Sequence, residues 1–294
     1  MKSLTALLAA STLLLSSLVT AHTHQESSFK ATEINSSLIF LQGKGGNIAL
    51  SKGEDGLLII DDDYADMSPA LKHQIEQYGG IEKLKYIVNT HWHGDHTGGN
   101  AALGHHADIV AHNNVRERLS SHQEVAFFKM KSGPQPKHAL PSLTYPESMQ
   151  MHFNNDTLTL VHYPNGHTDG DSVIFFEKAN VVHMGDHLFY PMFPFVDLGS
   201  GGNVVSYAKN VAAVLEKIND NTVVIPGHGP LTDKKGLSDF HQMLIGTLAE
   251  VKAMKDKGHS LEQCQKKGLS SQWDAWKKGF INQDAWISFI YNSL

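Results

Sequence analysis

Three histidines and an aspartate lie within six residues of this 294-residue chain. They form the segment His91-Trp92-His93-Gly94-Asp95-His96, which follows the apolar run Leu84–Val88. Imidazole and carboxylate groups are the usual protein ligands of zinc and similar divalent ions. A buried strand fixes the origin of a loop, and glycines allow the loop to turn sharply. The chain has 19 histidines, but a merely His-rich loop does not explain this spacing. We therefore interpret the segment as part of a metal site.

Three later loops share the same design, since each follows an apolar run, contains glycine and offers a histidine or an aspartate. The side chains that they offer are His167, Asp186 and His228. If the preceding strands lie in packed sheets with these loops at one edge, the four loops converge. The spacing therefore predicts one composite site built from distant parts of the chain.

The elements that must position these loops are short apolar strands alternating with helical patterns, which predict an α/β fold. Strands are expected over residues 37–42, 47–51, 57–60, 84–88, 108–111, 150–153, 157–162, 172–176, 180–183 and 222–225, and helices over 68–78, 113–121 and 204–218. From residue 232 onward the pattern is mostly helical and ends in an aromatic-rich tail, which we interpret as packing. Residues 122–146 contain four prolines and several apolar side chains, so they predict either a lid or a surface connector.

The first residues predict an export signal. Met1-Lys2 is a basic start, Leu4–Val19 is apolar and uncharged, and Val19-Thr20-Ala21 offers small residues to a signal peptidase. Cleavage is expected after Ala21, with an uncleaved anchor as the alternative. The single cysteine, Cys264, cannot form an internal disulfide and is interpreted as structural.

The predicted organisation has four parts: a signal peptide over 1–21, a flexible segment over 22–34, a metal-binding domain over 35–232 and a helical extension over 233–294 packed on the same domain. The formal net charge of −6 argues against nucleic acid or an anionic membrane as the main partner. No membrane span is expected in the mature form, and the sequence leaves the oligomeric state open.

The ordered motifs resemble those of the metallo-β-lactamase superfamily. They are HxHxDH at 91–96, Gly166-His167, Gly185-Asp186 and Gly227-His228-Gly229. The resemblance implies a four-layer αββα sandwich with metals at one edge, here with extra C-terminal helices. True metallo-β-lactamases usually carry Cys or Ser where Asp186 stands. The aspartate and the loop around His167 are more similar to glyoxalase II and lactonases.

The resemblance also implies residue roles around two zinc ions, although iron or manganese also fits a carboxylate-bridged pair. His91, His93 and His167 would hold the first ion, Asp95, His96 and His228 the second, and Asp186 would bridge both. A hydroxide between the metals would be the nucleophile, and Asp95 would also act in catalysis by carrying its proton.

Other residues near the motifs have weaker indications. Asp61 and His187 are candidates for orienting metal ligands, and Asp61 is equally well explained as part of a turn. Tyr190 is a candidate oxyanion donor or, alternatively, a packing aromatic. Asp62 and Asp63 are expected to form a solvated turn.

These expectations add up to a periplasmic or secreted binuclear hydrolase that cleaves a small-molecule ester, lactone or thioester. Hydrolysis of β-lactam antibiotics is the alternative, because a periplasm is where such compounds meet their targets. A metal-binding accessory protein without turnover is an alternative of another class.

Overall fold

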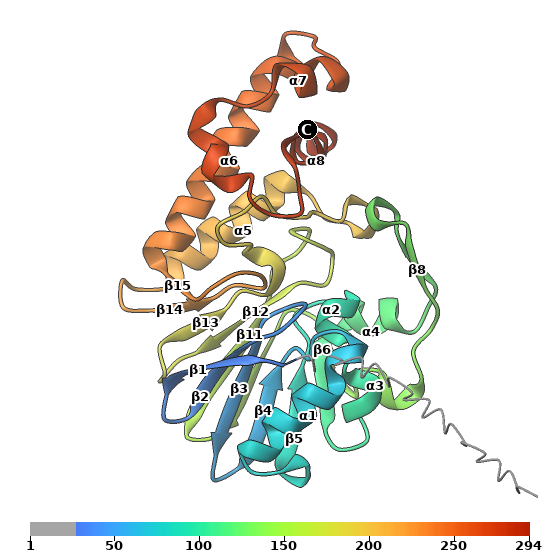
Figure 1. Cartoon of the computed structure of the whole chain (residues 1–294), viewed down its shortest axis with the longest axis vertical. Helices are drawn as coiled ribbons and strands as arrows, with labels where there is room; N and C mark the ends of the chain where they lie inside the picture. Colours follow the sequence, from blue (N-terminus) through green and yellow to red (C-terminus); the bar gives the residue numbers. More distant parts are fainter. Residues whose placement is uncertain (1–27) are drawn as a thin grey trace, which may run out of the picture.

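The computed structural model describes residues 28–294 (Figure 1). The predicted signal peptide and residues 22–27 of the predicted flexible segment lie outside this range. Within it, strand β1 (Lys30–Asn35) pairs antiparallel with β2 (Leu38–Gln42). The prediction of a flexible segment is therefore wrong from residue 30 onward, because the backbone there is held by a neighbouring strand.

The first sheet has seven strands in the order β1-β2-β3-β4-β5-β6-β9. The further strands are β3 (Ile48–Gly53), β4 (Gly56–Ile60), β5 (Leu84–Val88), β6 (Asp108–His112) and β9 (Leu143–Tyr145). Strands β4, β5, β6 and β9 run parallel to one another. The carboxyl ends of β4 and β5 therefore lie at the same edge, where Asp61 and the HxHxDH segment follow them directly.

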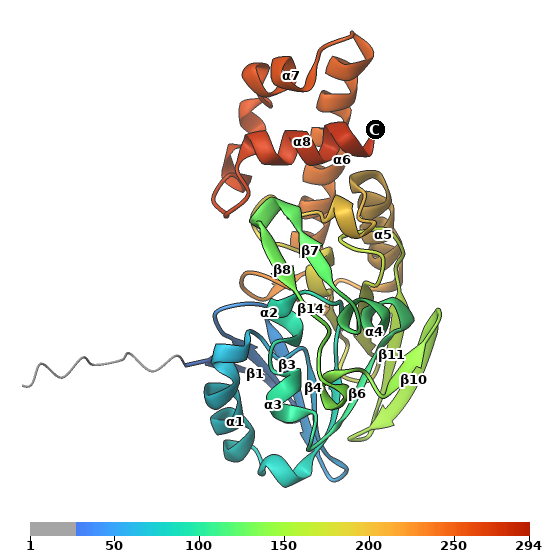
Figure 2. The same cartoon turned by 90° about the vertical axis from the view of Figure 1, so that its right-hand side faces the viewer.

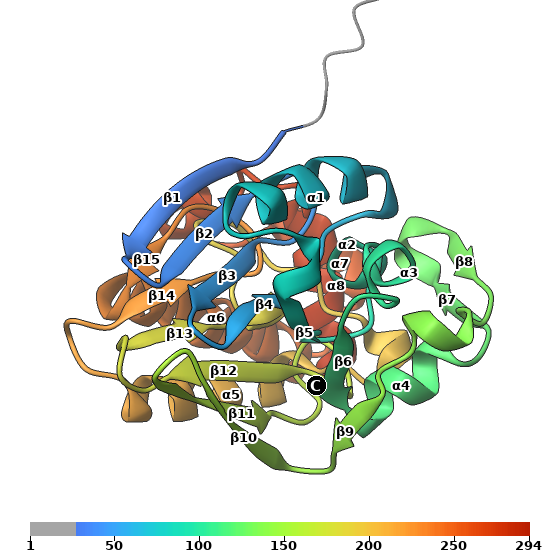
Figure 3. The same cartoon turned by 90° about the horizontal axis from the view of Figure 1, so that it is seen from below.

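The second sheet has six strands in the order β10-β11-β12-β13-β14-β15. They are β10 (Ser148–Phe153), β11 (Asp156–His162), β12 (Ser172–Phe176), β13 (Val181–His183), β14 (Val223–Ile225) and β15 (Thr232–Asp233). Its inner face packs on the first sheet, and Leu58 and Val88 of the first sheet belong to the same buried cluster as Leu160 and Ile174 of the second. Figure 3 shows the two sheets as adjacent layers, with α1 outside the first.

Helices cover the outer faces of both sheets. On the first sheet, α1 (Ser68–Gln77) buries Leu71 and Ile75, and α2 (Gly94–Thr97), α3 (Asn100–Leu103) and α4 (Asn113–Leu119) follow along the chain. On the second sheet, α5 (Val204–Lys217) packs against α6 (Lys234–Asp256). The predicted α/β sandwich is confirmed, with helix layers on either side of two sheets.

The C-terminal helices extend one end of the sandwich (Figures 1 and 2). They are the distal part of α6, α7 (Leu261–Lys267) and α8 (Gln283–Ser293). The fully buried Trp286 of α8 shares one hydrophobic cluster with Tyr207 of α5 and Phe240 of α6. The extension therefore packs on the same core as the second sheet. Among residues 28–294, no helix combines the length and the apolar character that a bilayer crossing requires.

The segment 122–146 is more regular than its prolines suggest. Strands β7 (Gln123–Val125) and β8 (Met130–Ser132) form a two-stranded hairpin joined by the 3-10 turn Ala126–Phe128. Strand β9 at the end of the segment then joins the first sheet beside β6. In Figure 2 the hairpin faces the viewer, between the sandwich and the C-terminal helices.

Candidate metal centre

The HxHxDH segment lies where β5 ends and α2 begins. His91 and His93 are in the connection, and Asp95 and His96 are in the first turn of α2. The Thr97 hydroxyl donates a hydrogen bond to the His93 carbonyl at 3.0 Å and closes this turn. A strand end and a helix start separated by only five residues thus present four ligand side chains from a rigid base.

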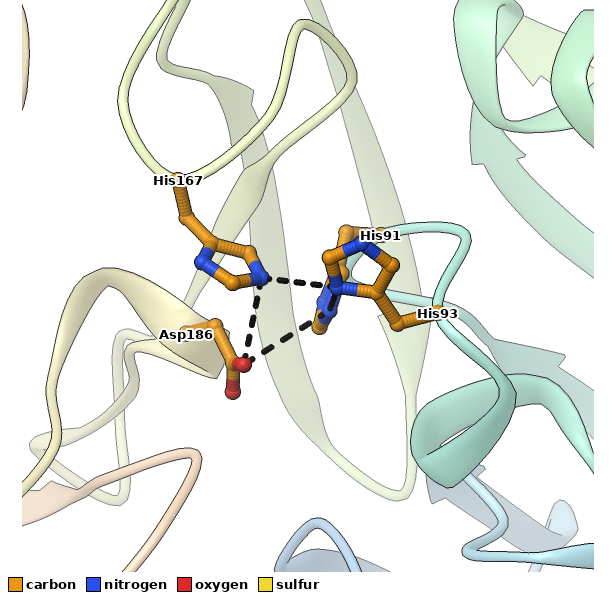
Figure 4. Close-up of side chains that lie close together, drawn as sticks. All are labelled: His91, His93, His167 and Asp186. Atoms are coloured by element: carbon orange, nitrogen blue, oxygen red, sulfur yellow. Dashed lines mark hydrogen bonds and ion pairs between the residues drawn. The ribbon is translucent and has the colours of Figure 1, made fainter. Parts of the chain in front are cut away.

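His91, His93, His167 and Asp186 form the first group of candidate ligands (Figure 4). The His93 Nδ1 atom lies 3.1 Å from His91 Nε2 and 2.9 Å from His167 Nε2. Asp186 Oδ2 lies 3.2 Å from His167 Nε2 and 3.7 Å from His91 Nε2. A tetrahedral zinc ion places neighbouring ligand atoms about 3.3 Å apart. The four buried side chains therefore fit one metal ion.

Asp95, His96 and His228 form the second group. The Asp95 Oδ2 atom lies 3.3 Å from His228 Nε2 and 3.7 Å from His96 Nε2. The other carboxylate oxygen of Asp186, Oδ1, lies 3.0 Å from His96 Nε2 and 3.3 Å from His228 Nε2. The Asp186 carboxylate therefore reaches both groups, one oxygen to each.

Asp186 Oδ1 is buried, and although two imidazole nitrogens lie within 3.3 Å of it, it accepts no hydrogen bond of good geometry. A buried anionic oxygen without a well-aligned donor is costly unless a cation compensates for it. The side chains that surround it offer imidazole nitrogens and a carboxylate, which are metal ligands. The orphaned oxygen and the donor set therefore fit a divalent ion shared between the groups.

Asp61 lies behind the second group and orients it. Its Oδ2 atom lies 2.6 Å from His96 Nδ1. Oδ2 also accepts a hydrogen bond from the Thr90 hydroxyl at 2.8 Å, and Oδ1 accepts one from the Thr90 backbone N–H at 2.7 Å. The Thr90 hydroxyl is also 3.1 Å from His91 Nδ1. Partners of this kind fix the tautomer of a ligand imidazole and leave Nε2 free for metal.

The two remaining imidazoles of the first group have equivalent partners. His167 Nδ1 donates to the Phe195 carbonyl at 2.9 Å, and His93 Nε2 lies 3.1 Å from Asp197 Oδ2. Sequence reasoning missed Asp197 as a site residue. The only sequence signal was an acid after the apolar stretch that follows Asp186, and that signal is weak on its own.

Asp62 and Asp63 are fully buried, so the prediction of a solvated turn is wrong for both. Asp62 Oδ1 accepts a hydrogen bond from the Gly99 N–H at 2.8 Å. Asp63 accepts hydrogen bonds from the N–H groups of Lys44 at 3.0 Å and Gly45 at 2.8 Å. Backbone donors from two neighbouring loops thus replace the water that these acids would otherwise bind.

His187 and Tyr190 lie near the site without joining it. His187 is buried, and a Cβ at Gly166 would collide with its ring, so it supports the loop that carries His167. The Tyr190 ring packs beside Trp276 with 6.1 Å between centroids, and Tyr190 is absent from the pocket lining. The packing alternative for Tyr190 is the one that the structure favours.

The two groups differ in protonation. Burial lowers the pKa of His91 well below its ordinary value and that of His167 to about 4, so both imidazoles are neutral at neutral pH. At His228, burial is outweighed by Asp186 and Asp95, which raise its pKa to about 9. Neutral imidazole is the metal-binding form. A metal ion that binds His228 must therefore displace a proton, whereas one that binds His91 and His167 meets neutral imidazoles.

A cavity of about 440 Å³ opens above the second group. Its floor contains His93, Asp95, Asp186 and His228, and its walls include the β7–β8 hairpin and Phe280 of the C-terminal extension. This volume is in the range of small-molecule sites. The hairpin therefore lines the pocket, which both alternatives for residues 122–146, a lid or a surface connector, allow. Phe280 belongs to the aromatic-rich C-terminal tail that we interpreted from the sequence as packing, and it is also a wall of the pocket.

The sandwich fold and the His/Asp metal site at its edge define a protein of the metallo-hydrolase class. The family model described as the metallo-beta-lactamase superfamily matches residues 43–228, and the chain belongs to this superfamily.

Relatives and solved structures agree with this assignment. A probable metallo-hydrolase of Methanocaldococcus jannaschii is 28% identical over 205 residues, covering 67% of this chain and 93% of that protein. A beta-lactamase-like protein 2 homolog of Caenorhabditis elegans is 27% identical over 157 residues, covering 51% of this chain and only 44% of that protein.

Among structures, the DIM-1 metallo-beta-lactamase matches with a TM-score of 0.60 and 16% identity, over 74% of this chain and 97% of that chain. The sec-alkylsulfatase Pisa1 from Pseudomonas sp. matches with a TM-score of 0.67 and 16% identity, over 90% of this chain and 50% of that chain. At these identities the structural matches show the fold alone.

Proposed function

We propose that this protein is an exported binuclear zinc hydrolase that cleaves the acyl bond of a small ester, lactone or thioester. The observation that carries the proposal is the division of the Asp186 carboxylate between two ligand groups beneath an open pocket. His91, His93, His167 and Asp186 would hold one zinc ion, and Asp95, His96 and His228 would share the second with Asp186. Zinc ions held there would supply a nucleophile from water at neutral pH and would polarise the acyl oxygen.

Asp95 has the properties of a proton carrier in such a reaction. Burial raises its pKa, but His96 and His228 outweigh burial and lower the pKa to about 2, so the carboxylate is ionised at neutral pH. It lines the pocket and can accept a proton from the attacking water and pass it to the leaving group. His93, also on the pocket floor, is held in place by Asp197.

Two aromatic rings lie against the ligands on this floor. Phe189 stacks on His228 with 4.8 Å between ring centroids, and Phe195 lies 5.8 Å from His93. Both rings are buried. Apolar walls of this kind strengthen the electrostatic interactions made at the metal centre.

The test is metal analysis of the purified protein followed by activity on five substrates: a chromogenic ester, a lactone, a thioester, a chromogenic cephalosporin and a secondary alkyl sulfate. We expect about two zinc ions per chain, as the two ligand groups imply, and preferential turnover of an ester, lactone or thioester. Chelation should abolish turnover, and zinc should restore it. Two bound ions without turnover of any acyl compound would contradict the proposal and favour the accessory protein. Fastest turnover of the cephalosporin would make this a β-lactamase.

The variant Asp95→Asn tests the proposed role of Asp95 in proton transfer. It should lower turnover by about 10²–10⁴-fold, the usual contribution of a positioned acid or base, while the first group still binds its ion. Asp108→Asn is the matched control, because Asp108 is exposed at the start of β6 and does not line the pocket. The control should keep the metal content and turnover of the unchanged protein.

A further inference from the structure

Exposed apolar side chains gather at the mouth of the pocket. Seven large apolar side chains are exposed among residues 28–294, and four of them lie around this opening. They are Phe127 at 44% exposure, Phe128 at 41%, Met130 at 53% and Phe280 at 55%. Clusters of exposed apolar groups mark binding surfaces more often than chance placement does.

The cluster is continuous with the metal centre. The Phe128 ring lies 4.8 Å from Phe195 and 6.0 Å from Phe280, measured between ring centroids. Phe280 in turn lies 6.3 Å from the ring of His228, a candidate ligand of the second group. Two elements far apart in sequence, the hairpin and the segment before α8, thus form one apolar surface that leads from solvent to the metal centre.

The cationic side chains that line the pocket are already paired. Their ion pairs are Lys44 with Asp66, Arg118 with Asp169, and Lys131 with Glu124. The Arg118 pair is bidentate, at 2.7 and 2.6 Å, and its guanidinium also lies 5.8 Å from the Trp92 ring centroid. Within the described lining, the walls therefore offer no unpaired cation to anchor an anionic group on the distal part of a substrate.

We propose that the substrate is an ester or lactone whose acyl group is an uncharged aliphatic chain lying between the β7–β8 hairpin and Phe280. This inference rests on the proposed hydrolase function and specifies its substrate class. The carbonyl would lie on the pocket floor above Asp95, and the chain would extend along Phe195 and Phe128 towards the opening. Each methylene that becomes buried on such a surface contributes about a fourfold gain in affinity.

The test compares 4-nitrophenyl esters that share one leaving group and differ only in the acyl chain: acetate, butyrate, octanoate and hydrogen suberate. The octanoate and suberate esters have chains of equal length, but the suberate ester ends in a carboxylate. We expect kcat/KM to rise from acetate to octanoate by roughly tenfold or more, and to fall by a similar factor from octanoate to hydrogen suberate. Equal or faster turnover of hydrogen suberate, or a preference for acetate, would overturn the inference.

Phe280→Ala and Ile245→Ala form a matched pair of variants. Phe280 lines the pocket, whereas Ile245 is 39% exposed on α6 and does not line it. Phe280→Ala should lower the octanoate-to-acetate ratio of kcat/KM by about fourfold or more, and Ile245→Ala should leave the ratio unchanged. An unchanged ratio in both variants would contradict the placement of the chain.

A binding measurement separates failure of this inference from failure of the hydrolase proposal. The uncharged ketone 2-decanone carries an eight-carbon chain and no bond to hydrolyse. Its binding can be followed by the change in tryptophan fluorescence, because Trp92, one of the four tryptophans, is buried against the pocket. One possible result is that no ester is hydrolysed, but 2-decanone binds and Phe280→Ala weakens its binding. That result would support the apolar binding site and contradict the hydrolase proposal. Ester hydrolysis without binding of 2-decanone would contradict the apolar binding site and leave the hydrolase proposal intact.

Discussion

Replacing Asp61 by asparagine removes a charge from the metal centre while keeping the size of the side chain. Asp61 has a φ of 64°, a left-handed conformation that asparagine tolerates better than other residues. The backbone should therefore keep its course. The effect of the substitution should be confined to the hydrogen bonds that the carboxylate makes to Thr90 and His96.

The expected effect on metal binding follows from the hydrogen-bond donors that face the Asp61 carboxylate. One carboxylate oxygen accepts from the Thr90 N–H, and the other lies 2.6 Å from His96 Nδ1. An amide has one oxygen and one NH₂ group, so in either orientation an NH₂ group faces a donor. If it faces His96, the ring is driven to the tautomer protonated at Nε2, the atom that must bind metal.

Loss of such a partner typically costs 10–100-fold in metal affinity, or about 1.4–2.8 kcal/mol. We expect this loss for the second ion, which His96 would hold, and a smaller change for the first. The assay is competition with a chelator of known affinity, read as two separate binding steps and accompanied by thermal unfolding to confirm the fold.

Asp62→Asn is the control. Burial disfavours the charged carboxylate and raises the pKa of Asp62 well above its ordinary value, and asparagine is uncharged and of similar size. Its Oδ1 accepts from the Gly99 N–H, and within residues 28–294 its side chain makes no hydrogen bond to a candidate ligand. Only its backbone N–H does so, by donating to the His96 carbonyl, and the substitution leaves that bond in place. This variant should bind both ions like the unchanged protein. If Asp61→Asn folds normally and also binds both ions with unchanged affinity, the orienting role of Asp61 is refuted.

Two further predictions concern the second ligand group. Gly46→Ala should weaken binding of the second ion and leave the first in place, because a Cβ there would lie only 2.6 Å from the His96 ring nitrogens. Gly94→Ala, with open space around the added Cβ, should behave like the unchanged protein, and equal metal loss in both variants would contradict this reasoning. The apparent affinity for the second ion should rise with pH up to about 9, because in the metal-free protein Asp186 and Asp95 outweigh burial and raise the pKa of His228 to about 9. Calorimetric titration in buffers of different ionisation enthalpy should show proton release on binding at pH 7.5, and an absence of release would count against a protonated His228.

The α/β sandwich and the convergence of the four loops were predictable because both rest on local patterns. Strands such as Leu84–Val88 are continuous apolar runs, and the loops after them are marked by glycine next to histidine or aspartate. These patterns act over a few residues, so they can be recognised without knowing what packs against them. The parallel pairing of β4 with β5 then follows from ordinary α/β connectivity.

The β7–β8 hairpin and β9 could not be predicted for the opposite reason. The strands β7, β8 and β9 have three residues each, and all three residues of β8 are exposed. The sequence therefore shows no alternation of apolar and polar residues there. Phe127 and Phe128 of this segment are partly exposed, and the covered side of these rings packs against Phe195 and Phe289, which come from distant parts of the chain. Only the folded structure brings these partners together.

The metal-site motif was recognised from the sequence, but the prediction of a solvated turn at the three consecutive acids after β4 was wrong for Asp62 and Asp63. Asp61 and Asp63 both adopt left-handed φ values, of 64° and 60°, which carry a conformational cost in a residue other than glycine. The turn that results aims Asp61 at the second ligand group, Asp62 at the Gly99 N–H and Asp63 at the Gly45 N–H. A polar triplet of this kind indicates a solvated turn only if water is its best partner. Here backbone N–H groups of two loops that border the second group bind these acids in place of water. The turn therefore holds both loops around the metal centre, and this role explains why the three acids are buried.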